Sequence, residues 1–110
     1  MLLETSFLMK TFNPYYAVIF TSTQTPTIEG YSEMAQKMED LAKAQDGFIG
    51  IESARNDVGI TVSYWESLDA IKRWKQHSEH LFAQQLGREQ WYNWYHVRIC
   101  KVEREYEFNL

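Results

Sequence analysis

The stretch from Gly59 to Leu81 reads GITVSYWESLDAIKRWKQHSEHL. Its first seven residues are mostly β-branched or aromatic, which is typical of a strand. From Ser67 onward apolar residues recur every three or four positions, which indicates an amphipathic helix with Ser67 as its N-cap. The junction gathers several aromatic and titratable side chains, namely Tyr64, Trp65, Trp74, His77 and His80. Such a junction forms either a packed corner of a small domain or the wall of an aromatic pocket.

The segments around this stretch predict three further strands and one further helix. A strand is expected over 15–23, and a hairpin over 48–54 and 59–65, whose two strands should pair antiparallel. A helix should begin with Ser32 as N-cap and end at Asp46-Gly47, and Gly87 should end the second helix. An aromatic-rich connection, REQWYNWY at 88–95, then leads to a last strand over 96–108.

The resulting order, β-α-β-β-α-β, predicts an α+β domain with a ferredoxin-like antiparallel sheet and both helices on one face. The uncovered face would still carry apolar side chains, and a second copy of the sheet would bury them. We therefore expect a homodimer formed face to face through the sheet. Depending on register, the side chains buried there are Tyr16 or Ile19, Ile51, Val62 or Trp65, and Val97 or Ile99.

Length and composition bound the class of protein. With 110 residues and 45% hydrophobic content, the chain suits one small domain, expected over 15–110 after an N-terminal arm at 1–14. A net charge of -4 argues against nucleic-acid binding, and no apolar run is long enough to span a membrane. Cys100 is the single cysteine, which suits a reducing cytoplasm. We expect a cytoplasmic protein.

Four motifs resemble the antibiotic biosynthesis monooxygenase family, a branch of the dimeric α+β barrel superfamily. They are GFIGIESARND at 47–57, GITVSYWES at 59–67, AIKRW at 70–74 and WKQHSEH at 74–80. The resemblance runs from about Tyr15 to Glu105 and implies the same fold. The family includes oxygenases that oxidise aromatic substrates without metal or flavin, as well as haem-degrading enzymes.

The resemblance implies that Trp65 and Trp74 line a pocket. Trp65 matches a strand-end Trp of the aromatic oxygenases, and Trp74 matches a helix Trp of the haem-degrading branch. That branch also requires a His about ten residues further on, where this chain has Gln84 and Gln85. It requires an Asn in the first strand as well, and YYAVIFTST has none. Haem degradation by that set of residues is therefore not expected, and no cofactor is predicted.

The residues themselves suggest how such a pocket would act. A His near its usual pKa is a suitable general base toward a phenol, and His77, at the border of the apolar stripe, is the catalytic candidate. Tyr64, Tyr92 and His80 are further substrate-binding candidates. No third ligand is placed to join His77 and His80, because Glu79 projects away from them and His96 lies on a different element, so no metal site is predicted.

These predictions lead to a functional hypothesis and two alternatives. The hypothesis is a cofactor-independent monooxygenase acting on a small aromatic or quinone-like substrate. The first alternative is a non-catalytic ligand-binding or stress-response module that uses the same pocket. The second is a haem-binding or haem-degrading protein.

Overall fold

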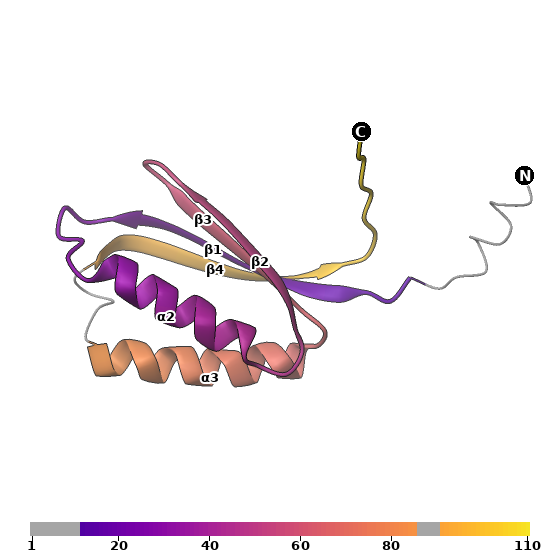
Figure 1. Cartoon of the computed structure of the whole chain (residues 1–110), viewed down its shortest axis with the longest axis horizontal. Coiled ribbons are helices and arrows are strands. Elements are labelled where there is room, and N and C mark those ends of the chain that lie inside the picture. The colour runs from indigo at the N-terminus through magenta and orange to yellow at the C-terminus, as the bar shows by residue number, and fades with distance from the viewer. Residues whose placement is uncertain (1–11, 86–90) are drawn as a thin grey trace, which may run out of the picture.

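The order of strands and helices is the predicted one (Figure 1). The computed structural model describes residues 12–85 and 91–110, without the side chains of 81–85. Within those residues the elements are β1 (Tyr15–Gln24), α2 (Tyr31–Lys43), β2 (Phe48–Arg55), β3 (Gly59–Trp65), α3 (Leu68–Gln85) and β4 (Tyr92–Val102). Most of the predicted N-terminal arm, together with Gly87, lies outside the described residues.

The four strands form one antiparallel sheet in the order β2-β3-β1-β4. The β2–β3 hairpin is confirmed, with Ile51 opposite Ser63. In the centre of the sheet Tyr16 pairs with Trp65 on one side and with Lys101 on the other. The register therefore brings the start of β1, the end of β3 and the end of β4 to the same end of the sheet.

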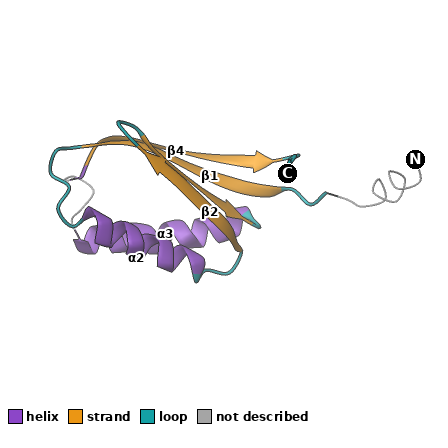
Figure 2. Ribbon diagram, turned by 45° about the horizontal axis from the view of Figure 1, so that its top comes forward, coloured by secondary structure: helices purple, strands orange, loops and turns teal. Residues whose placement is uncertain are grey.

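Both helices cover one face of the sheet, as predicted (Figures 1 and 2). Trp65 packs among helix residues, and its partner Tyr16 lies on the same face. Ile19 and Val62, which pair with each other, lie on the opposite face, called the open face below. This register settles two choices that the sequence left open. Ile19 rather than Tyr16, and Val62 rather than Trp65, lies on the open face.

Two predictions for the open face were wrong. Val97 and Ile99 pair with Phe20 and Val18, so both lie on the helix-facing side, and Arg98 occupies the open face instead. Ile51 also faces the helices, because it pairs with Ser63 in the strand that carries Trp65. The physical reason is that one position of register exchanges the two faces of a strand. In β2 an irregularity between Phe48 and Gly50 shifts the register by one position, and this turns Ile51 toward the helices.

The predicted helix caps had different outcomes. Ser67 caps α3 as expected, since its Oγ accepts a hydrogen bond of 3.0 Å from the Ala70 backbone N–H. Ser32 does not cap α2; the N-cap residue is Gly30, which makes no side-chain bond. Gly30 adopts a left-handed conformation with φ 82°, which glycine tolerates, and this allows the helix to begin at Tyr31.

The last strand begins earlier and ends earlier than predicted. Its aromatic start belongs to the sheet, because Trp94 pairs with Thr23 and Tyr95 with Ser22. The strand ends at Val102, where pairing with β1 stops at Tyr15. Residues 103–110 continue past the sheet and are called the C-terminal arm below.

The hydrophobic core lies between the helices and the end of β3. Its buried members are Ala42, Trp65, Ala70 and Ile71. Four partly buried residues pack against them, namely Tyr16, Val18, Phe48 and Trp74. The core is therefore centred on the strand-to-helix junction that the sequence singled out.

Candidate functional site

The β3–α3 junction is held by local hydrogen bonds. The Glu66 N–H donates to the Gly47 carbonyl over 2.8 Å, and Ser67 caps the helix immediately afterwards. Gly47 has φ 87°, and a Cβ added there would lie 2.7 Å from the Ala70 Cβ. The glycine thus lets the loop after α2 pass close to the first turn of α3. The end of β3 and the start of α3 are fixed relative to each other.

Trp65 and Trp74 are brought together, as the sequence predicted. Their rings stack with centroids 5.9 Å apart, and Phe48 meets Trp65 edge-on at 5.5 Å. Trp65 is fully buried, and its indole N–H donates to the Ser63 Oγ over 2.8 Å. The pair fills the space between the sheet and α3, so Trp65 reaches a ligand only through the residues around it.

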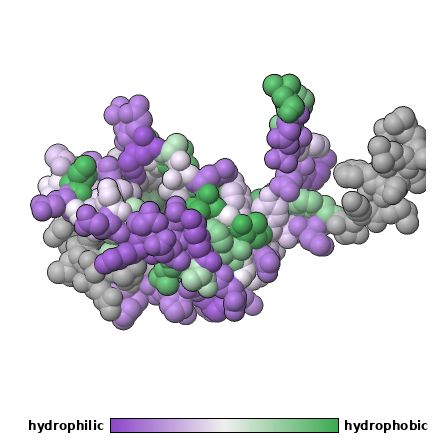
Figure 3. All heavy atoms as spheres, viewed as in Figure 1, coloured by the Kyte–Doolittle hydropathy of each residue, from purple (hydrophilic) through white to green (hydrophobic). Residues whose placement is uncertain are grey.

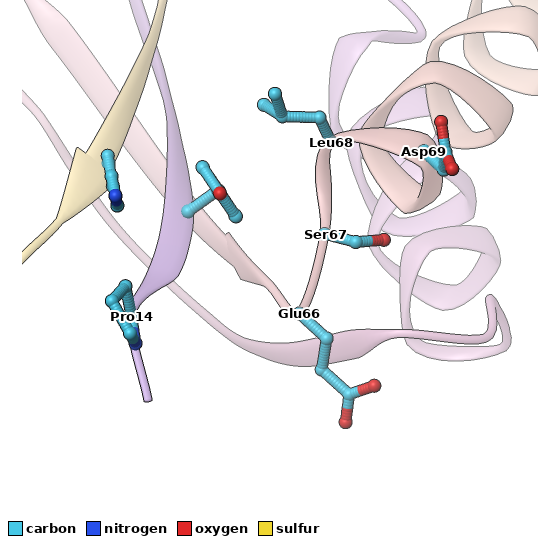
Figure 4. A pocket seen from close by; sticks show the side chains of 7 residues that line it. Pro14, Glu66, Ser67, Leu68 and Asp69 are labelled. Carbon is cyan, nitrogen blue, oxygen red and sulfur yellow. The ribbon is translucent and has the colours of Figure 1, made fainter. Parts of the chain in front are cut away.

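An open cleft of about 480 Å³ lies beside this pair, at the end of the sheet where β1 begins (Figure 4). Its walls come from the start of β1, the junction and the end of β4, and its lining residues are Pro14, Tyr16, Glu66, Ser67, Leu68, Asp69 and Lys101. Tyr16 connects the cleft to the tryptophans, because it packs against the core that contains Trp65. The volume falls within the range that small-molecule sites occupy.

The chemistry of the cleft comes from its rim. Leu68, which is 54% exposed, points toward the strands, whereas the carboxylates of Glu66 and Asp69 point away from them (Figure 4). Lys101 supplies a cation across from the first turn of α3, where helix N–H groups carry partial positive charge. The cleft therefore combines the apolar Leu68 side chain with one cation, Lys101, and with two carboxylates that point away from the strands.

His77 and His80 lie further along α3 than Trp74, and both side chains are exposed. Neither histidine lines the cleft. The catalytic candidate His77 therefore lies outside the cleft, on an exposed side of α3. Its proposed role in proton transfer stays a prediction, and so does a substrate contact for His80.

Tyr64 lies on the open face, away from Trp65, although the two are adjacent in the chain. Its hydroxyl donates to the Glu52 Oε1 over 2.6 Å, and this bond raises the pKa of Tyr64 to about 12. Tyr15 meets Tyr64 edge-on at 5.9 Å and donates in turn to the Glu105 carboxylate. Tyr64 is thus part of a polar group on the open face.

Tyr92 belongs to a third group, between the start of α2 and the far end of the sheet. Burial and a hydrogen bond of 3.3 Å to the Tyr31 hydroxyl raise the pKa of Tyr92. The Arg55 guanidinium lies 5.9 Å from the centre of the Tyr31 ring and donates to the buried Ser22. These contacts tie the β2–β3 hairpin to α2.

The six predicted residues therefore separate into distinct environments. The sequence missed the cleft residues Tyr16, Leu68 and Lys101, and also missed Tyr31 and Arg55 beside Tyr92. The pairing of Tyr16 with Lys101 brings the start of β1 and the end of β4 to the junction. Among residues 12–85 and 91–110, no three His, Cys, Asp or Glu side chains gather to hold a metal ion.

Comparisons with known protein families match this geometry. Residues 14–86 match the model of the family described as "Antibiotic biosynthesis monooxygenase". The chain belongs to the antibiotic biosynthesis monooxygenase family. The resemblance inferred from the four motifs is confirmed.

One relative and two solved structures illustrate the family. "Uncharacterized protein YqjZ" of Bacillus subtilis (strain 168) is 51% identical over 94 residues, which cover 84% of this chain and 82% of that protein. SnoaB of Streptomyces nogalater, a cofactor-independent oxygenase solved as a mutant, has a TM-score of 0.65 at 12% identity, covering 86% of this chain and 97% of that one. Rv0793 of Mycobacterium tuberculosis has a TM-score of 0.64 at 17% identity, covering 87% and 99%. The two structures show a shared fold.

A helix that crosses a membrane must be both long and strongly apolar. Within the described part of the chain, neither α2 nor α3 combines the length and the hydrophobicity needed to cross a membrane.

Proposed function

We propose that this protein oxidises a small aromatic or quinone-like molecule with molecular oxygen, without metal or flavin, in the cleft beside the β3–α3 junction. The observation that carries the proposal is the position of the cleft. In a chain of the monooxygenase family, the cleft is lined by Tyr16, which packs against the core that contains Trp65, and by Lys101 and the apolar Leu68. The cofactor-independent oxygenase SnoaB, which shares the fold, supports the reaction class.

The protein's part in this reaction is to bind the substrate and favour its ionised form. A phenol or enol that loses its proton becomes electron-rich enough to pass an electron to oxygen. In the balanced reaction a ring CH₂ becomes C=O, one oxygen atom of O₂ enters the product and the other leaves as water. All the electrons come from the substrate. Lys101 and the first turn of α3 stabilise the anion electrostatically.

The test is oxygen uptake with a panel of quinols, anthrones and polyphenols. We expect uptake with the native protein and a loss of about tenfold or more in kcat/KM for Lys101→Met, because the cation that favours the anion is removed. Lys72→Met is the matched control, since Lys72 is an exposed α3 residue outside the cleft. Equal activity of the two variants would refute the role of Lys101.

His77→Ala, measured in the same assay, tests whether His77 takes the proton from the substrate. If His77 acts as general base, its removal lowers activity and abolishes the acidic limb of the pH profile. Full activity in His77→Ala would show that His77 is not the general base, whatever the effect of Lys101→Met.

The alternatives are separate outcomes of the same experiments. Binding of an aromatic molecule, followed through tryptophan fluorescence, without oxygen uptake by any variant would indicate a ligand-binding module. The burial of Trp65 favours this interpretation, because a fully buried indole contributes to the core whether or not turnover occurs. A visible spectrum of bound haem during titration would indicate the haem-binding alternative.

We also propose that the protein acts as a homodimer through the open face. Exposed or partly exposed apolar side chains from several strands gather there, including Ile19, Ile60, Val62 and Trp94. A second copy would remove these side chains from water, which is favourable in proportion to the apolar area buried.

A further inference from the structure

Arg55 extends across the helix-facing side of the sheet to a buried serine two strands away. Arg55, Gly59 and Ser22 stand opposite one another in the neighbouring strands β2, β3 and β1. The Arg55 side chain crosses over Gly59 and donates a hydrogen bond to the Oγ of Ser22, which is fully buried. A Cβ added at Gly59 would collide with the guanidinium. The glycine therefore keeps the path of the arginine open.

The Arg55 guanidinium has no acidic partner in the described part of the chain. Within residues 12–85 and 91–110, the lysines at 43 and 75 form ion pairs, whereas Arg55 bonds to a neutral hydroxyl. Arginine presents five N–H donors in a fixed fork that matches a carboxylate. The donors that Ser22 does not use are reachable from water, because the Arg55 side chain is exposed. An anion from outside the protein could accept them.

Two phenol groups lie beside this guanidinium. The centre of the Tyr31 ring is 5.9 Å from the Arg55 Cζ, and the Tyr31 hydroxyl accepts a hydrogen bond of 3.3 Å from the Tyr92 hydroxyl. Burial raises the pKa of Tyr92, so this tyrosine stays neutral and keeps its proton. The O–H of Tyr31 has no acceptor among the described residues. Tyr31 and Arg55 therefore offer donors from two different elements to one anion.

Aromatic rings form a wall next to these donors. Phe20 stacks on Tyr95 with centroids 5.3 Å apart and meets Tyr92 edge-on at 5.4 Å. Tyr95 stands opposite Ser22 on the helix-facing side of β4 and is 38% exposed. Val97 follows on the same face and is 45% exposed. The wall is therefore accessible to a flat apolar group.

Apolar exposure alone does not distinguish this place from others. Exposed hydrophobic side chains also occur at the end of the C-terminal arm and in separate patches beside the helices (Figure 3). The distinguishing feature is a cation without a carboxylate, next to phenol donors and aromatic rings. The group also lies apart from the cleft, because the stretch of β1 from Tyr16 to Ser22 is about 20 Å long.

We propose that Arg55 and Tyr31 bind the carboxylate of a small aromatic acid, whose ring lies against Phe20 and Tyr95. The carboxylate accepts hydrogen bonds from the guanidinium and from the Tyr31 hydroxyl, and Tyr92 holds that hydroxyl in place. Charge-assisted hydrogen bonds of this kind are stronger than those between neutral groups. This second site does not depend on the oxidation proposed for the cleft.

The first experiment titrates the isotopically labelled protein with benzoate and follows the backbone amide signals by NMR. We expect saturable shifts that are largest near Ser22, Tyr31 and Arg55. Benzamide has the same ring without the charge, and acetate has the charge without the ring. Each should bind about tenfold or more weakly than benzoate. Absence of benzoate binding, or benzamide or acetate binding as tightly as benzoate, would overturn the proposal.

The second experiment displaces the guanidinium without removing any hydrogen-bond donor. Gly59→Ala puts a methyl group in the path of Arg55 and should raise the benzoate dissociation constant by about tenfold. Gly50→Ala is the matched control in the preceding strand, because its added Cβ would lie 4.0 Å from the Tyr64 ring, an ordinary contact. Circular dichroism checks that both variants are folded. Unchanged affinity in Gly59→Ala would show that the held guanidinium is not needed, and would overturn the site.

The third experiment removes the two donors one at a time. Arg55→Gln should weaken benzoate binding by about tenfold or more, and Tyr31→Phe, which keeps the ring, by about threefold to tenfold. Arg98→Gln on the open face and Lys101→Met in the cleft are the controls and should leave the affinity unchanged.

These controls separate the second site from the cleft. A loss of benzoate binding in Lys101→Met, without a loss in Arg55→Gln, would place the acid in the cleft and overturn the proposal. Oxygen uptake in the presence of quinols tests the cleft independently of benzoate binding.

Discussion

At the residue scale, adjacent side chains have different tasks because a strand alternates its faces. Trp65 closes the core under α3, whereas Tyr64 points to the open face and bonds to Glu52. The sequence grouped the two as one aromatic corner. In the structure they contribute to different surfaces, and each can be tested separately.

Replacing Trp65 by Ala should destabilise the protein by about 3–5 kcal/mol, because it leaves a cavity in the core and removes the partner of Ser63. Urea unfolding measures this loss. His77→Ala is the control on the exposed side of α3 and should change stability by less than about 0.5 kcal/mol. Similar losses in both variants would contradict the position of Trp65 in the core.

Tyr64 should titrate well above the usual tyrosine value of 10.0, because its hydrogen bond to Glu52 raises the pKa to about 12. Since the pKa is raised in the folded state, its contribution to stability is present below pH 10.0 and is lost as pH rises toward about 12. The phenolate absorption of the native protein minus that of Tyr64→Phe gives the titration curve. Glu52→Gln should move the curve to lower pH, and an unchanged curve would show that the bond is not responsible.

At the element scale, each helix begins by a different device. A serine side chain starts α3, whereas a left-handed glycine starts α2. The position of α3 matters more for the site, because its first turn lines the cleft and faces Lys101. We therefore expect a substitution in the first turn of α3 to affect both the stability of the protein and the proposed binding of a ligand in the cleft.

Ser67→Ala should lower the free energy of unfolding by about 0.5–2 kcal/mol, because the Ala70 N–H loses its acceptor. Thermal or urea unfolding provides the measurement, and Ser67→Asp should restore most of the loss. Ser32→Ala is the comparison in α2, where the N-cap is Gly30, and we expect it to be nearly neutral. An equal loss at Ser32 would indicate that α2 begins where the sequence pattern placed it.

At the scale of the whole molecule, the two faces of the sheet are used differently. The helices cover one face (Figure 2), and the core and the cleft lie on the same side of the sheet. The other face presents the Tyr15–Tyr64 pair and one row of paired residues that runs across the sheet from Glu52 through Val62 and Ile19 to Arg98. The proposed dimer through this open face would leave the cleft of each copy on its own helix-facing side.

Charge reversal tests the orientation of the dimer. In the proposed face-to-face dimer, a two-fold axis parallel to the strands would place Glu52 of one copy opposite Arg98 of the other. Arg98→Glu and Glu52→Arg should then each weaken association, because each sets like charges opposite one another. The two reversals combined should restore much of the affinity in sedimentation equilibrium. Lys72→Glu on α3 serves as the control. Additive losses in the combined variant would exclude the pairing of these two residues.

The family and the order of elements were readable from the sequence because they depend on local patterns. Strand alternation, the helical spacing from Ser67 and the hairpin between Phe48 and Trp65 each involve residues close together in the chain. The proximity of Trp65 and Trp74 could also be predicted from the sequence, because the end of β3 leads directly into α3. Ser32 misled because a serine before an apolar stripe has the same pattern whether or not its hydroxyl caps the helix.

The residues of the cleft and of the open face could not be predicted from such local patterns, because strand pairing brings them together from distant parts of the chain. Tyr16 and Lys101 are far apart in the chain, and one step of register between β1 and β4 would have exchanged Lys101 for a neighbour. The sequence by itself thus determined the fold family and the aromatic junction, through short-range periodicity. The tertiary structure determined which side chains share the junction's cleft and which share the open face, because strand register fixes both.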